Sequence, residues 1–124
     1  MFAALEVSFV LVEAVVALVP AIERRNRDLA DQILRAATSV SLNLAEGQRS
    51  ARGNQHKHYA IAHGSASEVK AGVRLAIALR LVEPAAAEHA LSVLDRELAL
   101  LWKLTHPSGQ PRTKPFELWR EPSK

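Results

Sequence analysis

Turn-forming residues are scarce through the first 106 positions of this chain, and this scarcity restricts the fold more than any other feature. The 124 residues include five glycines and six prolines, and four of the prolines follow His106. An all-β fold needs many more turn signals, together with β-branched and aromatic side chains. Here only six residues are aromatic, whereas the helix-favouring residues Ala and Leu are abundant. The sequence therefore predicts a single all-α domain.

Four segments carry apolar residues at helical spacing and predict an antiparallel up-down four-helix bundle over residues 1–106. We expect helices at about 3–19, 28–47, 55–81 and 84–105. The expected apolar faces, in chain order, are Leu5, Phe9, Val12, Val16 and Val19; Leu29, Ile33, Ala36, Val40 and Leu44; Tyr59, Ala62, Ala66, Val69, Val73 and Ala76; and Ala87, Leu91, Leu94, Leu98 and Leu101.

Three residues are expected to set helix boundaries. Pro20 removes a backbone donor, so it predicts an end or a kink of the first helix. Gly47 stands where a left-handed residue would close the second helix. Pro84 suits the first turn of the fourth. Residues 107–124 form a Pro-rich, extended tail with an apolar group at its end, which predicts either folding back on the bundle or docking on a partner.

The first 22 residues are very apolar, but Glu6 and Glu13 interrupt them. A signal peptide opens with basic residues, and a bilayer-spanning helix needs about 20 predominantly apolar residues. We therefore expect a bundle helix too short and too charged to span a membrane. The absence of cysteine excludes disulfides and thiolate zinc sites and is compatible with a reducing compartment. A cytoplasmic protein without membrane contact is expected.

Positive charge is concentrated around the second helix and the connection after it. The net charge is +3, and residues 23–58 hold seven basic against four acidic side chains. Such a basic segment permits contact with RNA or DNA phosphates. The candidate nucleic-acid-binding residues are Arg24, Arg25, Arg27, Arg49, Arg52 and Lys57.

No catalytic constellation, cofactor motif or metal site is evident. No Glu is followed three residues later by His, as carboxylate-bridged metal bundles require. One enzymatic alternative stays open: Arg52 with His58, or Arg49 with His56, resembles the Arg and His pair of HEPN-type ribonucleases. There an Arg would hold the scissile phosphate while a His moves protons.

Two polar stripes, on the second and third helices, are expected to face each other. They place Glu68 within reach of Arg35 or Asn43, with glycines allowing close helix approach. Such a layer fixes the register of helices more often than it catalyses.

The segment from Leu29 to Gly47 and the block from Ala62 to Glu68 resemble the signature of the 23S rRNA-intervening-sequence protein family, over about residues 5–105. The resemblance implies a four-helix bundle, often a ring of five subunits. A related branch of this family is similar to the accessory protein of diversity-generating retroelements, a basic ring that binds reverse transcriptase and nucleic acid. The residues that match the motif, with an implied structural or assembly role, are Gln32, Arg35, Ser39, Asn43, Glu46, Gly47, Gly64, Ser65 and Glu68.

Together these features predict a non-enzymatic homo-oligomer, a homopentamer by resemblance, that acts as a nucleic-acid-binding or accessory scaffold. Its expected partners are other copies of itself, RNA or DNA, and a nucleic-acid enzyme such as a reverse transcriptase. The alternatives are a scaffold that docks proteins through its C-terminal tail, and the HEPN-like ribonuclease.

Overall fold

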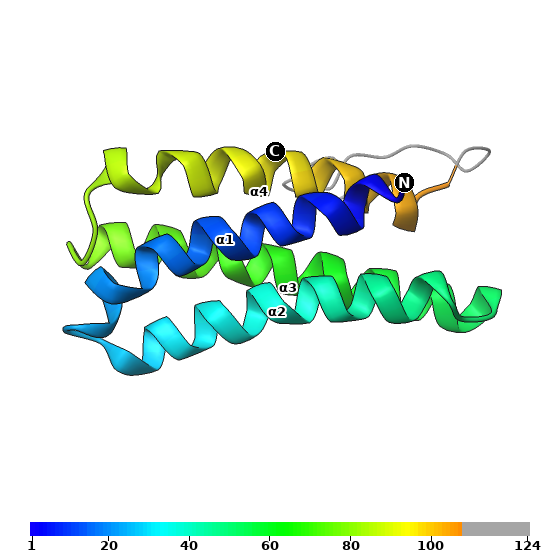
Figure 1. Cartoon of the computed structure of the whole chain (residues 1–124), viewed down its shortest axis with the longest axis horizontal. Helices are drawn as coiled ribbons and strands as arrows, with labels where there is room; N and C mark the ends of the chain where they lie inside the picture. The colour runs from blue at the N-terminus through cyan, green and yellow to red at the C-terminus, as the bar shows by residue number, and fades with distance from the viewer. Residues whose placement is uncertain (108–124) are drawn as a thin grey trace, which may run out of the picture.

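The computed structural model describes residues 1–107 and contains four helices: α1 (Ala3–Glu23), α2 (Arg27–Gln48), α3 (Arg52–Ala78) and α4 (Pro84–Thr105). The helices run antiparallel, joined by short turns (Figure 1). Each helix packs on two neighbours, because contacts join α1 to α2, α2 to α3, α3 to α4 and α4 back to α1. The predicted all-α four-helix bundle is confirmed. The expectations for the tail lie almost entirely outside the described residues.

The inward faces of α2, α3 and α4 are those that the sequence predicts. All six residues expected inside α3 are buried, and so are all five expected inside α2. On α4 three of the five are fully buried, while Leu91 and Leu98 are half-buried against the core. The opposite faces of these helices are mostly polar, although Leu42, Ile61 and Leu75 are exposed there, so the 3.6-residue period identified the buried side correctly.

The face predicted for α1 is only partly right, because Leu5, Val12 and Val19 are half-buried against the core but the other two residues are exposed. Phe9 is 48% exposed and Val16 is 51% exposed. The buried side chains of α1 are instead Ala4, Val7, Ser8, Leu11, Ala14, Val15, Leu18 and Ile22. Because α1 is apolar almost all round, it offers two apolar stripes and its periodicity could not choose between them. One stripe fills the core and the other lies on the outside.

Pro20 does not end α1, because the helix continues to Glu23. Pro20 and Val16 are both exposed, so water can satisfy the Val16 carbonyl that loses its intrahelical donor. At 21 residues α1 is long and apolar enough to cross a membrane by length and composition, so the expected exclusion on length fails. In the bundle α1 packs on α2 and α4, which bury one of its sides.

Gly47 does not close α2 in a left-handed conformation, contrary to expectation. It lies inside the helix, which ends one residue later, and it is buried. Its place follows from packing, because a Cβ atom there would lie 2.7 Å from Cε1 of Tyr59. Among the non-glycine residues of 1–107, Arg80 is the one with a left-handed backbone; it lies in the turn between α3 and α4 and has φ of 61°.

The core divides into a larger and a smaller apolar cluster, and buried polar side chains mark the boundary on three helices: Ser8, Ser41 and Glu97. The hydroxyls of Ser8 and Ser41 lie 2.8 Å apart and form a hydrogen bond between α1 and α2. Glu97 on α4 is 0% exposed, and neither carboxyl oxygen has a hydrogen-bond partner within the described chain. Burial raises the pKa of Glu97 to about 8, against a smaller lowering by Arg96. The carboxyl group is therefore protonated at neutral pH.

Candidate functional site

Part of the predicted polar layer between α2 and α3 forms a hydrogen-bonded chain. The hydroxyls of Ser39 and Ser65 lie 2.8 Å apart. Nδ2 of Asn43 donates to the carbonyl oxygen of Ser39 at 3.0 Å and to its hydroxyl at 3.1 Å. Oδ1 of Asn43 lies 2.9 Å from Nδ1 of His58. These contacts tie the middle of α2 to α3.

The same chain fixes the tautomer of His58. A backbone carbonyl can only accept, so the amide nitrogen of Asn43 faces Ser39 and its oxygen faces His58. Nδ1 of His58 therefore carries a hydrogen and donates it to Oδ1 of Asn43. The sequence motif included Asn43 but not His58. The short connection between α2 and α3 places His58 near the end of α2. That spacing alone does not show which way the ring of His58 points.

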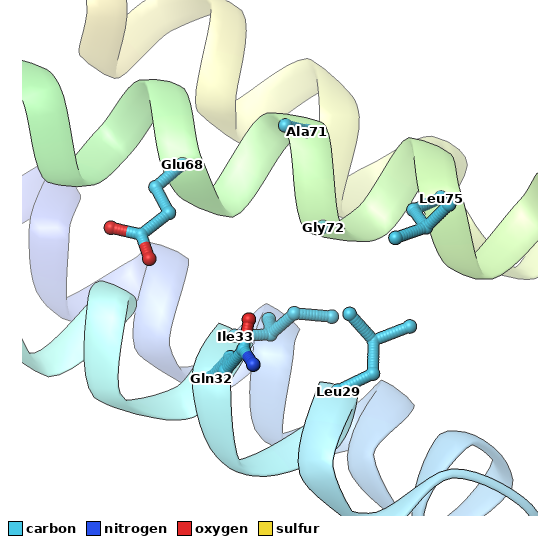
Figure 2. A pocket seen from close by; sticks show the side chains of 7 residues that line it. All are labelled: Leu29, Gln32, Ile33, Glu68, Ala71, Gly72 and Leu75. Carbon is cyan, nitrogen blue, oxygen red and sulfur yellow. The ribbon is translucent and has the colours of Figure 1, made fainter.

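Apart from the buried Gly47, the remaining motif residues lie on the outside of the single chain. Glu68 extends from α3 toward α2 over a groove of about 170 Å³, and Gln32 stands on the opposite wall (Figure 2). Gly72 lines this groove, and a Cβ atom there would lie 2.6 Å from Cγ1 of Ile33. Close approach of α2 and α3 therefore requires Gly72.

The expected contact of Glu68 with Arg35 or Asn43 is absent from the hydrogen bonds and ion pairs of residues 1–107. Gly64 has no atom within 4 Å of a Cβ position, so it serves no close approach within one chain. Four further motif residues are also exposed: Gln32, Arg35, Glu46 and Glu68. Packing inside the subunit explains Ser39, Asn43, Gly47 and Ser65, but not the exposed members of the motif.

The six candidate nucleic-acid-binding residues are all exposed, but the fold separates them into two groups. Arg24, Arg25 and Arg27 surround the α1–α2 turn, whereas Arg49, Arg52 and Lys57 follow the end of α2 (Figure 1). The two groups lie at opposite ends of the bundle, separated by the length of α2, about 33 Å at 1.5 Å per residue. We call these the first and second basic ends. Arg80 adds to the first, where Glu23, Asp28 and Glu83 lie in the same turns and offset part of the positive charge.

A pocket of about 460 Å³ lies at the second basic end. Its wall combines the start of α3 with the end of α4, and the lining residues are Arg52, Gln55, His56, Tyr59, Lys103, Leu104 and Pro107. Lys103 and His56 were not among the predicted binding residues. Lys103 is far from Arg52 in the sequence, so only the packing of α4 on α3 brings the two cations to one pocket.

Among the residues proposed for a ribonuclease, Arg52 and His56 line one pocket, and His58 is hydrogen-bonded to Asn43. The pairing of Arg52 with His58, or of Arg49 with His56, stays a prediction. Within residues 1–107 no three His, Asp or Glu side chains are grouped as a metal site would need.

Comparison with known proteins agrees with this architecture. The model of a family described as 23S rRNA-intervening sequence protein matches residues 2–103. A crystal structure of a protein of unknown function from the S23 ribosomal protein family of Bacteroides thetaiotaomicron superposes with a TM-score of 0.76 at 20% identity. The alignment covers 82% of this chain and 97% of that one. No curated protein matches the chain.

Proposed function

This chain belongs to the 23S rRNA-intervening sequence protein family, and on that premise we propose that it is a non-enzymatic, homo-oligomeric scaffold that contacts RNA or DNA. The proposed assembly is a ring of five subunits in the cytoplasm. Its proposed protein partner is a nucleic-acid enzyme such as a reverse transcriptase. The observation that carries the assembly is the uncovered apolar face of α1.

Within residues 1–107, the outer stripe of α1 exposes several apolar side chains. Phe9, Val10 and Val16 are each more than 40% exposed, and Val12 and Val19 are half-buried beside them. A contiguous apolar face of this kind marks an interaction surface in a stable protein. A second subunit is the occupant that fits best, because the stripe is straight, helical and interrupted by few charges, as helix packing between subunits requires.

Contact with nucleic acid is supported by the two basic ends. The ion pair found in residues 1–107 joins Lys70 to Asp95, so it uses none of the six candidate cations. A ring of subunits would repeat each basic end around its axis and so multiply a modest charge into a strong local field. Affinity that depends on such contacts falls steeply with salt.

The assembly is tested by light scattering during size-exclusion chromatography. Wild type is expected to elute as an oligomer, and the double variant Phe9→Ser with Val16→Ser as a monomer that keeps the wild-type helical content by circular dichroism. The matched control is Leu42→Ser, which alters a 69% exposed leucine on α2 and should stay oligomeric. The proposal would be contradicted by a monomeric wild type. It would also be contradicted if the wild type bound lipid vesicles in a flotation assay through the outer stripe of α1.

Nucleic-acid binding is tested by titrating a labelled single-stranded RNA at low and high salt. Reversing Arg49 and Arg52 to Glu, or Arg24 and Arg25 to Glu, is expected to weaken binding without loss of helicity. Unchanged affinity in both variants would remove this part of the proposal. Cleavage of the RNA that disappears in His56→Ala would replace the scaffold by the ribonuclease alternative.

A further inference from the structure

The pocket at the second basic end joins two helices that are distant in the sequence. Arg52, His56 and Tyr59 reach it from the first eight residues of α3, and Lys103 and Leu104 from the last turn of α4. With a volume of about 460 Å³ it has the size of sites that hold one small ligand. It is too small for a duplex, but it can admit a single nucleotide.

Within residues 1–107, the charged side chains that line this pocket are basic. They are two permanent cations, Arg52 and Lys103, and the described lining contains no carboxylate. Neither cation takes part in the ion pair found within residues 1–107, which joins Lys70 to Asp95. His56 is a further donor beside them. The arrangement suits a ligand with two negative charges.

The start of α3 reinforces this charge. Its N-cap residue, Ala51, has no side-chain hydrogen bond to offer, and the first turn contains no acidic residue. The amide groups of that turn therefore carry the positive end of the helix dipole without compensation. The positive charge of Arg52 is repelled by this end of the helix dipole, which destabilises the first turn of α3. An anion bound beside Arg52 would offset that repulsion.

The inner wall of the pocket is apolar. Tyr59 is buried on its other side against Gly47 and lies beside Phe2, with ring centroids 5.9 Å apart, so the tyrosine ring is fixed. Leu104 stands next to it in the lining. Because Tyr59 is only 7% exposed, its accessible edge and the half-buried Leu104 provide a small apolar wall against which the sugar of a nucleotide can pack. Cations on one side and an apolar wall on the other match the two parts of a nucleotide.

We propose that this pocket binds the terminal phosphate of a nucleic-acid strand, with the last nucleotide against Tyr59. The inference rests on the proposed function, because it takes the ligand to be RNA or DNA. A terminal phosphate carries close to two negative charges at neutral pH, whereas an internal phosphodiester carries one. Arg52 and Lys103 neutralise both charges of the terminal group, so the pocket distinguishes the end of a strand from its middle.

The test compares oligonucleotides that differ only at their ends. A labelled single-stranded 12-mer RNA is titrated with a 5′-phosphate, with a 3′-phosphate and with hydroxyls at both ends. We expect one phosphorylated form to bind about tenfold more tightly than the hydroxyl form, as one charge-assisted contact provides. Adenosine monophosphate should compete more strongly than inorganic phosphate if the last nucleotide packs on Tyr59.

The variants separate this pocket from the general charge of the protein. Arg52→Gln with Lys103→Gln should abolish the preference for the phosphorylated strand. The matched control, Arg24→Gln with Arg25→Gln at the opposite end, should weaken all three strands and keep the preference. Amide shifts at residues 52–55 on adding adenosine monophosphate to the wild type test the site even if the pocket variant folds poorly.

The two levels of the argument fail in different ways. Equal binding of all three strands, weakened equally by both double variants, would overturn the terminal-phosphate site and leave nucleic-acid binding intact. Absence of binding by every strand would overturn both. A preference that survives in the pocket variant would place the phosphate elsewhere and would likewise overturn this inference.

Discussion

The ring of Tyr59 packs directly on the backbone of Gly47, so closely that a Cβ atom on Gly47 would lie 2.7 Å from Cε1 and 2.9 Å from Cδ1 of the ring. The ring cannot easily retreat, because Tyr59 is buried and Phe2 lies beside it. Gly47→Ala is therefore expected to lower the free energy of unfolding by about 1–2 kcal/mol, since overpacking outweighs the gain in helix propensity. Chemical denaturation measures this loss.

Gly64 provides the matched control on α3. A Cβ atom there meets nothing within 4 Å, so Gly64→Ala gains helix propensity without a clash and should stabilise the subunit by up to about 1 kcal/mol. Equal effects of the two substitutions would show that Tyr59 does not select glycine at position 47. Loss of assembly in Gly64→Ala alone would place this motif residue at a subunit interface.

The hydrogen bond between Asn43 and His58 should couple α2 to α3 energetically. A double-mutant cycle with Asn43→Ala and His58→Ala is expected to give a coupling of about 0.5–1.5 kcal/mol, as for other partly buried hydrogen bonds. Asn54→Ala, at an exposed position of α3, serves as the control and should show no coupling to His58. Imidazole ¹⁵N shifts should report hydrogen on Nδ1 of His58, and hydrogen on Nε2 alone would contradict the assigned network.

Glu97 should make the stability of the bundle fall as the pH rises. Burial raises its pKa from 4.5 to about 8 in the folded state, so between these values the folded protein holds a proton that the unfolded chain has released. The free energy of unfolding then decreases with pH, by roughly 1.4 kcal/mol per unit within this window. The contribution is complete below pH 4.5 and is lost as the pH passes 8.

Glu97→Gln removes this titration and should flatten the dependence between pH 6.5 and 8.5. Below pH 6.5 the titration of His63 acts on stability in the opposite direction. Burial, and to a smaller extent the charge of His106, lowers the pKa of His63. Acidification therefore lowers the free energy of unfolding through His63. The upper range therefore isolates Glu97. Thermal melts at half-unit intervals measure the slope, and an unchanged slope in Glu97→Gln would show that another group causes it.

Pro20 interrupts the hydrogen bonding of α1 without ending the helix. Pro20→Ala restores the donor to the Val16 carbonyl at an exposed site, so we expect stabilisation of about 1–3 kcal/mol. Pro84→Ala is the control, since Pro84 stands in the first turn of α4, where no intrahelical donor is lost. Destabilisation by Pro20→Ala would indicate that the proline ring fixes the path into the α1–α2 turn.

The sequence by itself determined the class, the number of helices and the buried faces of α2, α3 and α4. These three helices alternate apolar and polar residues with the helical period, so burial of the apolar side is the only favourable solution. The resemblance to the family signature pointed to Ser39, Asn43 and Ser65, and these residues do join α2 to α3. Local regularity was enough for each of these results.

Only the tertiary structure decided which side of α1 faces the core, why Gly47 is glycine, and how the basic residues are grouped. An apolar helix has no polar side to orient it, so contacts with α2 and α4 choose its buried stripe. Position 47 requires glycine because the ring of Tyr59 on the next helix leaves no room for a Cβ atom. Arg52 and Lys103 line the same pocket only because α4 packs on α3. Each of these depends on residues that are distant in the chain, and a local periodicity holds no information about their distance in space.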